Sequence, residues 1–178
     1  MGLRAYGITV FAATAALWVM SGTQHEKSVL AATQPDAVRV LEAEAAAHPR
    51  DPLAYRALAQ AYLDARQPGL AIVLAASADP SVRDDVRVEH VVARALVDAG
   101  RNDEALSLEK RVLAACSPLA DGRPGAEGCD PVLFASALRR SEILGELVAL
   151  GVEDAQAHPE ASLVAYQNAT REARVAMQ

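Results

Sequence analysis

The sequence predicts an all-α protein, and three observations carry this prediction. Apolar residues make up 52% of the chain but aromatic residues only 4%, and alanine, the residue with the highest helix propensity, dominates the apolar set. Proline, aspartate and glycine recur at positions where helices start and stop. A stretch between Pro49 and Val112 also repeats itself at a spacing of 34 residues, which is typical of stacked helix hairpins.

The first element is an uncharged apolar run over residues 5–20, preceded by Arg4. A basic residue before such a run is typical of a secretory signal, and the run is near the short end of the roughly 17 to 25 residues that cross a bilayer. We interpret residues 1–22 as a signal anchor or a signal peptide, and residues 23–34 as a linker. The poor cleavage pattern after Met20 favours the anchor, and a buried helix of a soluble domain is the remaining alternative.

Local signals place the next helices. Proline suits the first turn of a helix and aspartate suits the N-cap, so helices are expected to begin at Pro35 and, behind Asp51, at Pro52. The expected boundaries are residues 35–47, 52–66, a return helix after Pro68-Gly69 that ends near Ala78, 84–99 and 102–115. We expect a turn at residues 79–81, a left-handed helix stop at Gly100 and an N-cap at Asn102.

Two copies of the repeat align without a gap. The matched pairs are Leu58 with Val92, Ala59 with Ala93, Ala61 with Ala95, Tyr62 with Leu96, Asp64 with Asp98, Ala65 with Ala99, Ala71 with Ala105 and Leu74 with Leu108. Small alanines let two helix backbones approach closely, while Tyr62 and Leu96 fill the remaining gaps.

This pattern resembles that of the tetratricopeptide repeat family. The first copy supplies the residue types of that pattern at Tyr55, Leu58, Ala59, Tyr62, Ala71, Ala75 and Pro80. The second copy is degenerate, because Glu89 stands where the pattern has an aromatic residue and Glu109 where it prefers a large apolar one. Residues 35–47 resemble the second helix of an incomplete earlier repeat. The resemblance covers residues 35–116 and implies a short solenoid of antiparallel hairpins; a helical bundle without repeats is the alternative.

The only two cysteines, Cys116 and Cys129, enclose three glycines and two prolines, a composition that predicts a loop over residues 117–130. In an exported chain the pair is expected to form a disulfide, and reduced thiols are the alternative. The spacing matches neither a zinc nor a redox motif.

Residues 131–178 are expected to form a helical hairpin that caps the stack. Asp130 and Pro131 begin a long apolar helix, which Gly151 ends, and a last helix should cover residues 159–177. Its apolar stripe, which we expect to close the last open face, contains Leu163, Tyr166, Ala169, Ala173 and Val175 or Ala176.

Charge and motifs exclude several functions. A formal net charge of −6 argues against nucleic acid as a partner, because phosphates attract basic surfaces. His25, His48, His90 and His158 lack the spacing of metal ligands, and the sequence contains no nucleophile elbow, phosphate-binding glycine loop or dinucleotide fingerprint. We therefore predict no catalytic residue, no metal and no cofactor.

The family resemblance implies a concave, partner-binding groove formed by the first helix of each hairpin. The candidate positions outside the packing set are Arg56, Gln60, Leu63, His90, Arg94 and Val97. Arg56 and Arg94 suit pairing with a carboxylate of a bound peptide, and solvated or locally paired arginines are the alternative.

We thus expect a non-catalytic scaffold or assembly subunit that binds an unidentified protein or peptide. A helical extracytoplasmic enzyme, such as a cell-wall lytic protein, is the alternative, and a cleft lined by a buried acid would favour it. The N-terminal run and the alanine-rich, lysine-poor composition indicate a bacterial cell envelope. There the chain is expected to be anchored in the inner membrane facing the periplasm, or secreted to the periplasm.

Overall fold

The computed structural model describes residues 35–122, 124–155 and 157–175. These residues contain eight α-helices, one 3-10 helix and no strand, so the predicted all-α class is confirmed for them. The predicted N-terminal anchor at residues 1–22 and the linker at residues 23–34 lie outside the described part of the chain. Within that part, no helix combines the length and the apolar character needed to cross a membrane.

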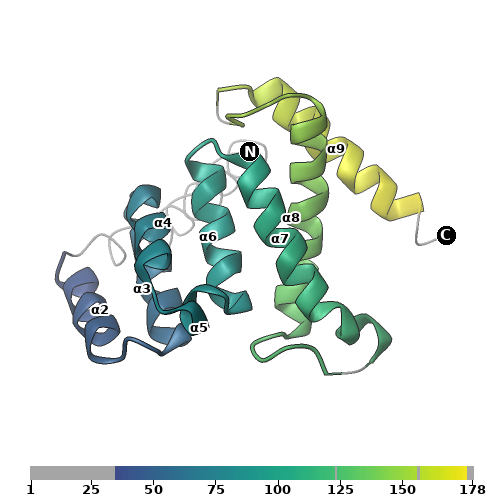
Figure 1. Ribbon diagram of the computed structural model, residues 1–178. Helices are drawn as coiled ribbons and strands as arrows, with labels where there is room; N and C mark the ends of the chain where they lie inside the picture. Colours follow the sequence, from purple (N-terminus) through teal and green to yellow (C-terminus); the bar gives the residue numbers. More distant parts are fainter. Residues whose placement is uncertain (1–34, 123, 156, 176–178) are drawn as a thin grey trace, which may run out of the picture.

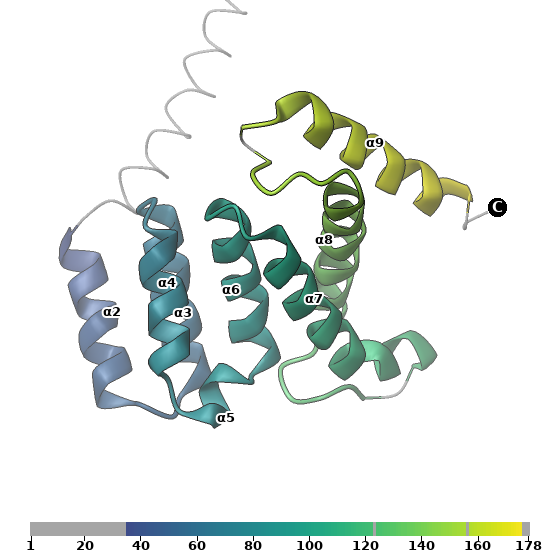
Figure 2. The ribbon, with the colours of Figure 1, turned by 45° about the horizontal axis from the view of Figure 1, so that its top comes forward.

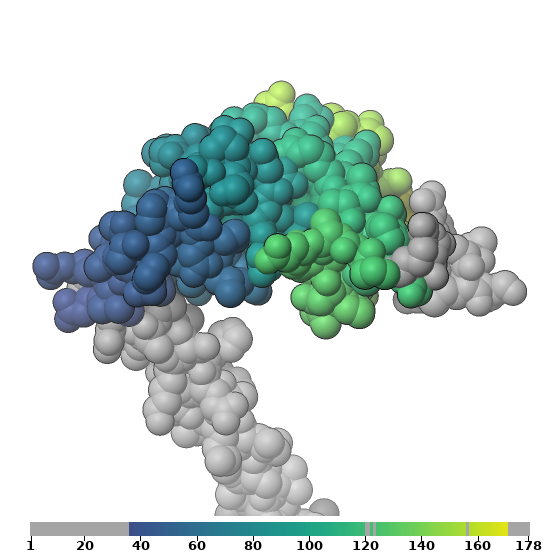
Figure 3. Space-filling model, turned by 60° about the horizontal axis from the view of Figure 1, so that its bottom comes forward, coloured from purple at the N-terminus to yellow at the C-terminus, as the bar shows by residue number. Residues whose placement is uncertain are grey.

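The helices form hairpins that pack side by side along the chain (Figures 1 and 2). Their bounds are α2 Pro35–Ala47, α3 Pro52–Asp64, α4 Pro68–Ser77, α5 Pro80–Arg83, α6 Val86–Asp98, α7 Asn102–Cys116, the 3-10 helix η1 Ser117–Asp121, α8 Pro131–Ala149 and α9 Pro159–Val175. Helices α3 and α4, α6 and α7, and α8 and α9 pair as hairpins, and α6 and α7 also join the first hairpin to the last. Figure 3 shows this order along one face, from the blue first helices through teal to green.

Aspartate side chains cap four of the described helices, α3, α5, α6 and α8. Asp51 and Asp130 accept hydrogen bonds from the backbone N–H groups of Leu53 and Val132, as the sequence predicts. Residues 79–81 were expected to form a turn, but Asp79 caps the short helix α5 instead, by accepting from the N–H of Ser81.

The predicted N-cap at Asn102 is wrong, although the left-handed stop at Gly100 is confirmed by its φ of 73°. Asn102 is already helical, and the residue at the cap position is Arg101. The Asn102 side chain is buried and donates from Nδ2 to the carbonyl of Val152 at 2.8 Å. It therefore ties the start of α7 to the segment after α8, a contact between residues that are distant in sequence.

The core follows the aligned alanines. Ala59, Ala71, Ala93 and Ala105 are each at most 1% exposed, which allows neighbouring helices to approach closely. Leu144 and Leu147 of α8 join the apolar cluster that continues into α6 and α7. The last hairpin therefore packs on the second copy of the repeat through apolar side chains.

The predicted stripe of α9 is only partly correct. Ala169, with Ala165, is buried, but Leu163 and Tyr166 are 57% and 48% exposed. Helix α9 packs mainly on the end of α8 and extends away from the other helices (Figure 2). The buried side of α9 thus carries small side chains, and Leu163 and Tyr166 lie on its exposed side.

The loop between α7 and α8 is closed by a Cys116–Cys129 disulfide, with a Cα–Cα distance of 5.5 Å. Part of this predicted loop is the 3-10 helix η1. Near its other end Gly128 has a φ of 87°, and a Cβ there would lie 2.6 Å from Nε of Arg87. Arg87 in turn pairs with the N-cap of α6, Asp85, at 2.7 Å. The loop is thus held against the start of α6.

Candidate partner-binding groove

A groove with a volume of about 500 Å³ lies between α4 and α7, with α6 as its floor. Its apolar lining consists of Ile72, Ala75, Ala76, Val92, Leu96 and Leu108. The volume lies within the range of about 300 to 1,000 Å³ that is usual for ligand pockets. Since α4 and α7 are the second helices of their hairpins, the groove opens on the side opposite to the one that the family pattern implies.

Charged side chains divide the rim of the groove into two ends. Arg83 and Arg111 lie at one end, together with Glu89, whereas Arg101, Asp103 and Glu104 lie at the other. The formal charges therefore sum to plus one at the first end and to minus one at the second. Arg101, at the N-cap of α7, and Arg111 are ten positions apart, which corresponds to about 15 Å along a helix.

Glu89 is the buried acid of this groove. Its side chain is 8% exposed, and Oε1 accepts hydrogen bonds from Nη2 and Nε of Arg111 at 2.7 and 2.8 Å. Burial raises the pKa of Glu89, and the bond from Arg111 opposes that rise only in part. Glu89 replaces the aromatic residue of the repeat pattern and joins α6 to α7 by an ion pair.

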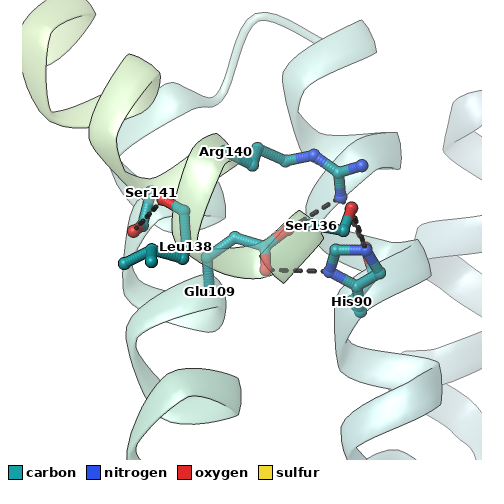
Figure 4. A network of polar contacts seen from close by, with 6 residues as sticks. All are labelled: His90, Glu109, Ser136, Leu138, Arg140 and Ser141. Atoms are coloured by element: carbon teal, nitrogen blue, oxygen red, sulfur yellow. Dashed lines mark hydrogen bonds and ion pairs between the residues drawn. The ribbon is translucent and has the colours of Figure 1, made fainter. Parts of the chain in front are cut away.

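A second buried carboxylate, Glu109, lies on the other side of the α6–α7 contact (Figure 4). Its side chain is fully buried, Oε1 accepts from Nη1 of Arg140 at 2.7 Å, and Oε2 lies 2.9 Å from Nδ1 of His90. The other ring nitrogen of His90, Nε2, lies 3.1 Å from Oγ of Ser136. Arg140 also donates to the backbone carbonyl of His90 at 3.1 Å. This network connects α6, α7 and α8.

The order serine, histidine, carboxylate in this network is that of a hydrolase triad, but the setting is not. Ser136 lies inside α8, where its backbone N–H belongs to the helix and is not available to an oxyanion. None of Ser136, His90 and Glu109 lines the groove between α4 and α7. We therefore assign the network a structural role: it compensates a buried charge at a position that normally holds an apolar residue.

The structure does not bring the predicted groove residues together on one open surface. Leu63 is 3% exposed and belongs to the apolar core, so the prediction that it faces a ligand is wrong. His90 is held in the Glu109 network, and Val97 packs against the core.

The remaining predicted positions lie nearer the surface. Arg56 and Arg94 are exposed, and Gln60 donates to Asp64 at 2.8 Å on its own helix. A role for the two arginines in binding stays a prediction. Neither of them lines the groove between α4 and α7.

Sequence reasoning missed the groove and both buried carboxylates, although one signal pointed to them. Glu89 and Glu109 are the two positions at which the second copy departs from the repeat pattern. In the structure both departures are buried and paired with arginine. A charged residue at a packing position of a repeat therefore marks an ion pair with a neighbouring helix.

Comparison with models of protein families, with curated proteins and with solved structures gave no match for this chain.

Proposed function

We propose that the chain is a non-catalytic, tetratricopeptide-like scaffold that binds a partner protein or peptide in the groove between α4 and α7. The groove itself carries this proposal, because it combines an apolar floor with a charged rim. Grooves of this kind accept the apolar face of an amphipathic segment, while the rim charges set its orientation. The stacked hairpins and the 34-residue repeat support the family likeness.

The proposed location is a bacterial cell envelope, with the chain anchored in the inner membrane or secreted to the periplasm. The Cys116–Cys129 disulfide supports an oxidising compartment. The basic residue and apolar run at the start of the sequence support export. Fractionation of cells that express the full chain, followed by a thiol-labelling assay, tests both points.

Site-specific photo-crosslinking in cells tests the binding function. A photoreactive residue in place of Ser107, which is exposed and lines the groove, is expected to capture a protein reproducibly. The same residue in place of Arg56 serves as a matched control, because Arg56 is exposed on α3 outside the groove. The added change Leu108→Glu should abolish capture from the Ser107 position. Capture from Arg56 alone would place the binding surface on the concave side formed by the first helices of the hairpins. Capture from neither position would contradict the scaffold function.

A helical enzyme is the second candidate, and Glu89 is the observation that favours it. A buried acid with a raised pKa in a cleft is a feature of glycosidases. However, Glu89 is bonded to Arg111, and the other groove carboxylates lie at the opposite end. Peptidoglycan turbidity assays with the full chain and with Glu89→Gln distinguish the two functions. Clearance that Glu89→Gln abolishes would establish the enzyme, and no clearance is expected from a scaffold.

A further inference from the structure

Helix α9 presents an exposed apolar stripe that the described part of the chain does not cover. Leu163, Val164 and Tyr166 are 57%, 44% and 48% exposed. Leu163 and Tyr166 are three residues apart, and Glu160 precedes Leu163 by the same interval, so the three lie along one side of the helix. This side of α9 therefore begins with an acidic side chain and continues with apolar ones.

The groove has the complementary features. Its floor is apolar, and its cationic end is formed by Arg83 and Arg111, whose side chains are 49% and 59% exposed. Arg83 pairs with Asp84 at the surface, and such exposed pairs are weak enough to be exchanged for a new partner. The groove extends about 15 Å from this end, which corresponds to about ten residues of a helix.

We propose that the groove between α4 and α7 receives helix α9 of a second copy of this chain. Glu160 lies at the cationic end, beside Arg83 and Arg111, and Leu163 and Tyr166 contact the apolar floor. The incoming helix then runs antiparallel to α4 and α7, in the same direction as α6 on the floor. This inference rests on the proposed function and names the partner.

The chemistry of both surfaces supports a second copy over an unrelated partner. One molecule exposes both an apolar groove and an apolar helix, and each surface gains by being removed from water. Glu160 adds a carboxylate beside Arg83 and Arg111, whose side chains remain 49% and 59% exposed in their pairs with Asp84 and Glu89. Two copies that exchange α9 form a closed dimer, and copies that bind in a row form a longer assembly.

Charge exchange tests this pairing with the full chain, followed by sedimentation velocity over a range of concentrations. We expect Arg83→Glu and Glu160→Arg each to weaken self-association by about fivefold to tenfold, because each places like charges together. The double variant should recover most of the loss. Leu163→Glu should abolish association, and Leu53→Glu on α3, at a site of similar exposure, should leave it unchanged. A concentration-independent monomer in the unmodified chain would overturn the inference.

Disulfide trapping locates the contact. A chain with Leu163→Cys is mixed with a chain carrying Ala76→Cys, whose side chain is exposed in the groove. Oxidation should yield a covalent dimer, whereas Leu163→Cys mixed with Leu53→Cys should not. Together with the photo-crosslinking, this experiment distinguishes failure of the second-copy inference from failure of the proposed binding function. If the photoreactive residue at Ser107 captures a different protein and the cysteine pair does not react, the scaffold stands and the second copy is wrong. If neither reaction occurs, both proposals fail.

Discussion

The two copies of the repeat share one register but fill their interiors in different ways. In the first copy Tyr55 and Ala75 occupy the positions that Glu89 and Glu109 occupy in the second. Tyr55 packs between two apolar clusters, and Ala75 is 4% exposed. The second copy buries two carboxylates at these places and compensates each with an arginine. A repeat thus tolerates a charge at a packing position when a neighbouring helix supplies the counterion.

The source of the counterion makes the two copies unequal. Arg111 belongs to the second copy itself, but Arg140 comes from α8. The first copy makes its equivalent outside contact through a neutral group, since Tyr62 donates from its hydroxyl to Oε1 of Glu42 in α2 at 2.8 Å. Both copies also pack on their outer neighbour through apolar side chains, but the second adds a buried charge to this packing and the first adds one hydrogen bond from a neutral hydroxyl.

The largest effect is expected from Glu109→Ala. This change leaves Arg140 and His90 beside a cavity without their acceptor, so the free energy of unfolding should fall by about 3 to 5 kcal/mol. Urea unfolding followed by circular dichroism measures the loss. Glu104→Ala, on the exposed face of the same helix, is the control and should have a much smaller effect, because it removes only an exposed ion pair. If both variants lost the same free energy of unfolding, the buried charge of the second copy would not contribute to stability as proposed.

The disulfide adds a constraint that only the second copy has. The bonded cysteines are 13 residues apart, so replacing both Cys116 and Cys129 by alanine should lower the free energy of unfolding by about 3 kcal/mol. A reductant should destabilise the unmodified chain by a similar amount. The same reductant should have no effect on the double variant, and a residual effect there would show that the loss has another origin.

Tyr62→Phe examines the first copy. Removing the hydroxyl should cost about 1 kcal/mol, the usual net value of one hydrogen bond. Burial, together with the bond to Glu42, raises the pKa of Tyr62 to about 12. The unfolded chain releases this proton first, so stability should fall as the pH rises from 10.0, the ordinary value, to about 12. Tyr62→Phe should lack that part of the pH dependence, whereas Tyr166→Phe, at an exposed site, should retain it.

The smallest effect is the pH dependence that Glu89 contributes. Because its pKa is raised in the folded chain, the folded state binds the proton more tightly, and acidification from neutral pH toward 4.5 should favour folding through this group. Asp79 and Glu104 act in the opposite direction, since hydrogen bonds lower their pKa values. The contribution of Glu89 to the pH dependence is measured as the difference in urea midpoint between the unmodified chain and Glu89→Gln at several pH values. A difference that does not vary with pH would show that Glu89 keeps its charge.

Local sequence signals located every described α-helix except the short α5, but they were not sufficient for the contacts between helices. Asp51-Pro52 and Asp130-Pro131 mark helix starts because a cap acts within three residues. The two cysteines identify the loop because they enclose it. Asn102 reads as a cap by the same local rule, yet its partner is the carbonyl of Val152, 50 residues further along the chain.

The groove lies beyond local reasoning for the same reason. Helical periodicity shows that Leu163 and Tyr166 share a side of α9, but not whether that side faces α8 or solvent. The pattern of a repeat family likewise gives the packing alanines and leaves open which side of the stack is hollow. Glu89 and Glu109 were visible as exceptions, and their arginine partners follow only from the arrangement of α6, α7 and α8.

The contact between Gly128 and Arg87 has a consequence for engineering the loop between α7 and α8. A glycine-rich loop on a surface suggests a free choice of sites for a reporter or an affinity module, but the two ends of this loop differ. A Cβ at Gly122 would meet nothing within 4 Å, whereas one at Gly128 would collide with the arginine that pairs with the cap of α6. A module inserted after Gly122 should therefore leave the fold intact. The same module beside Gly128 would disturb a helix start more than forty residues earlier in the chain.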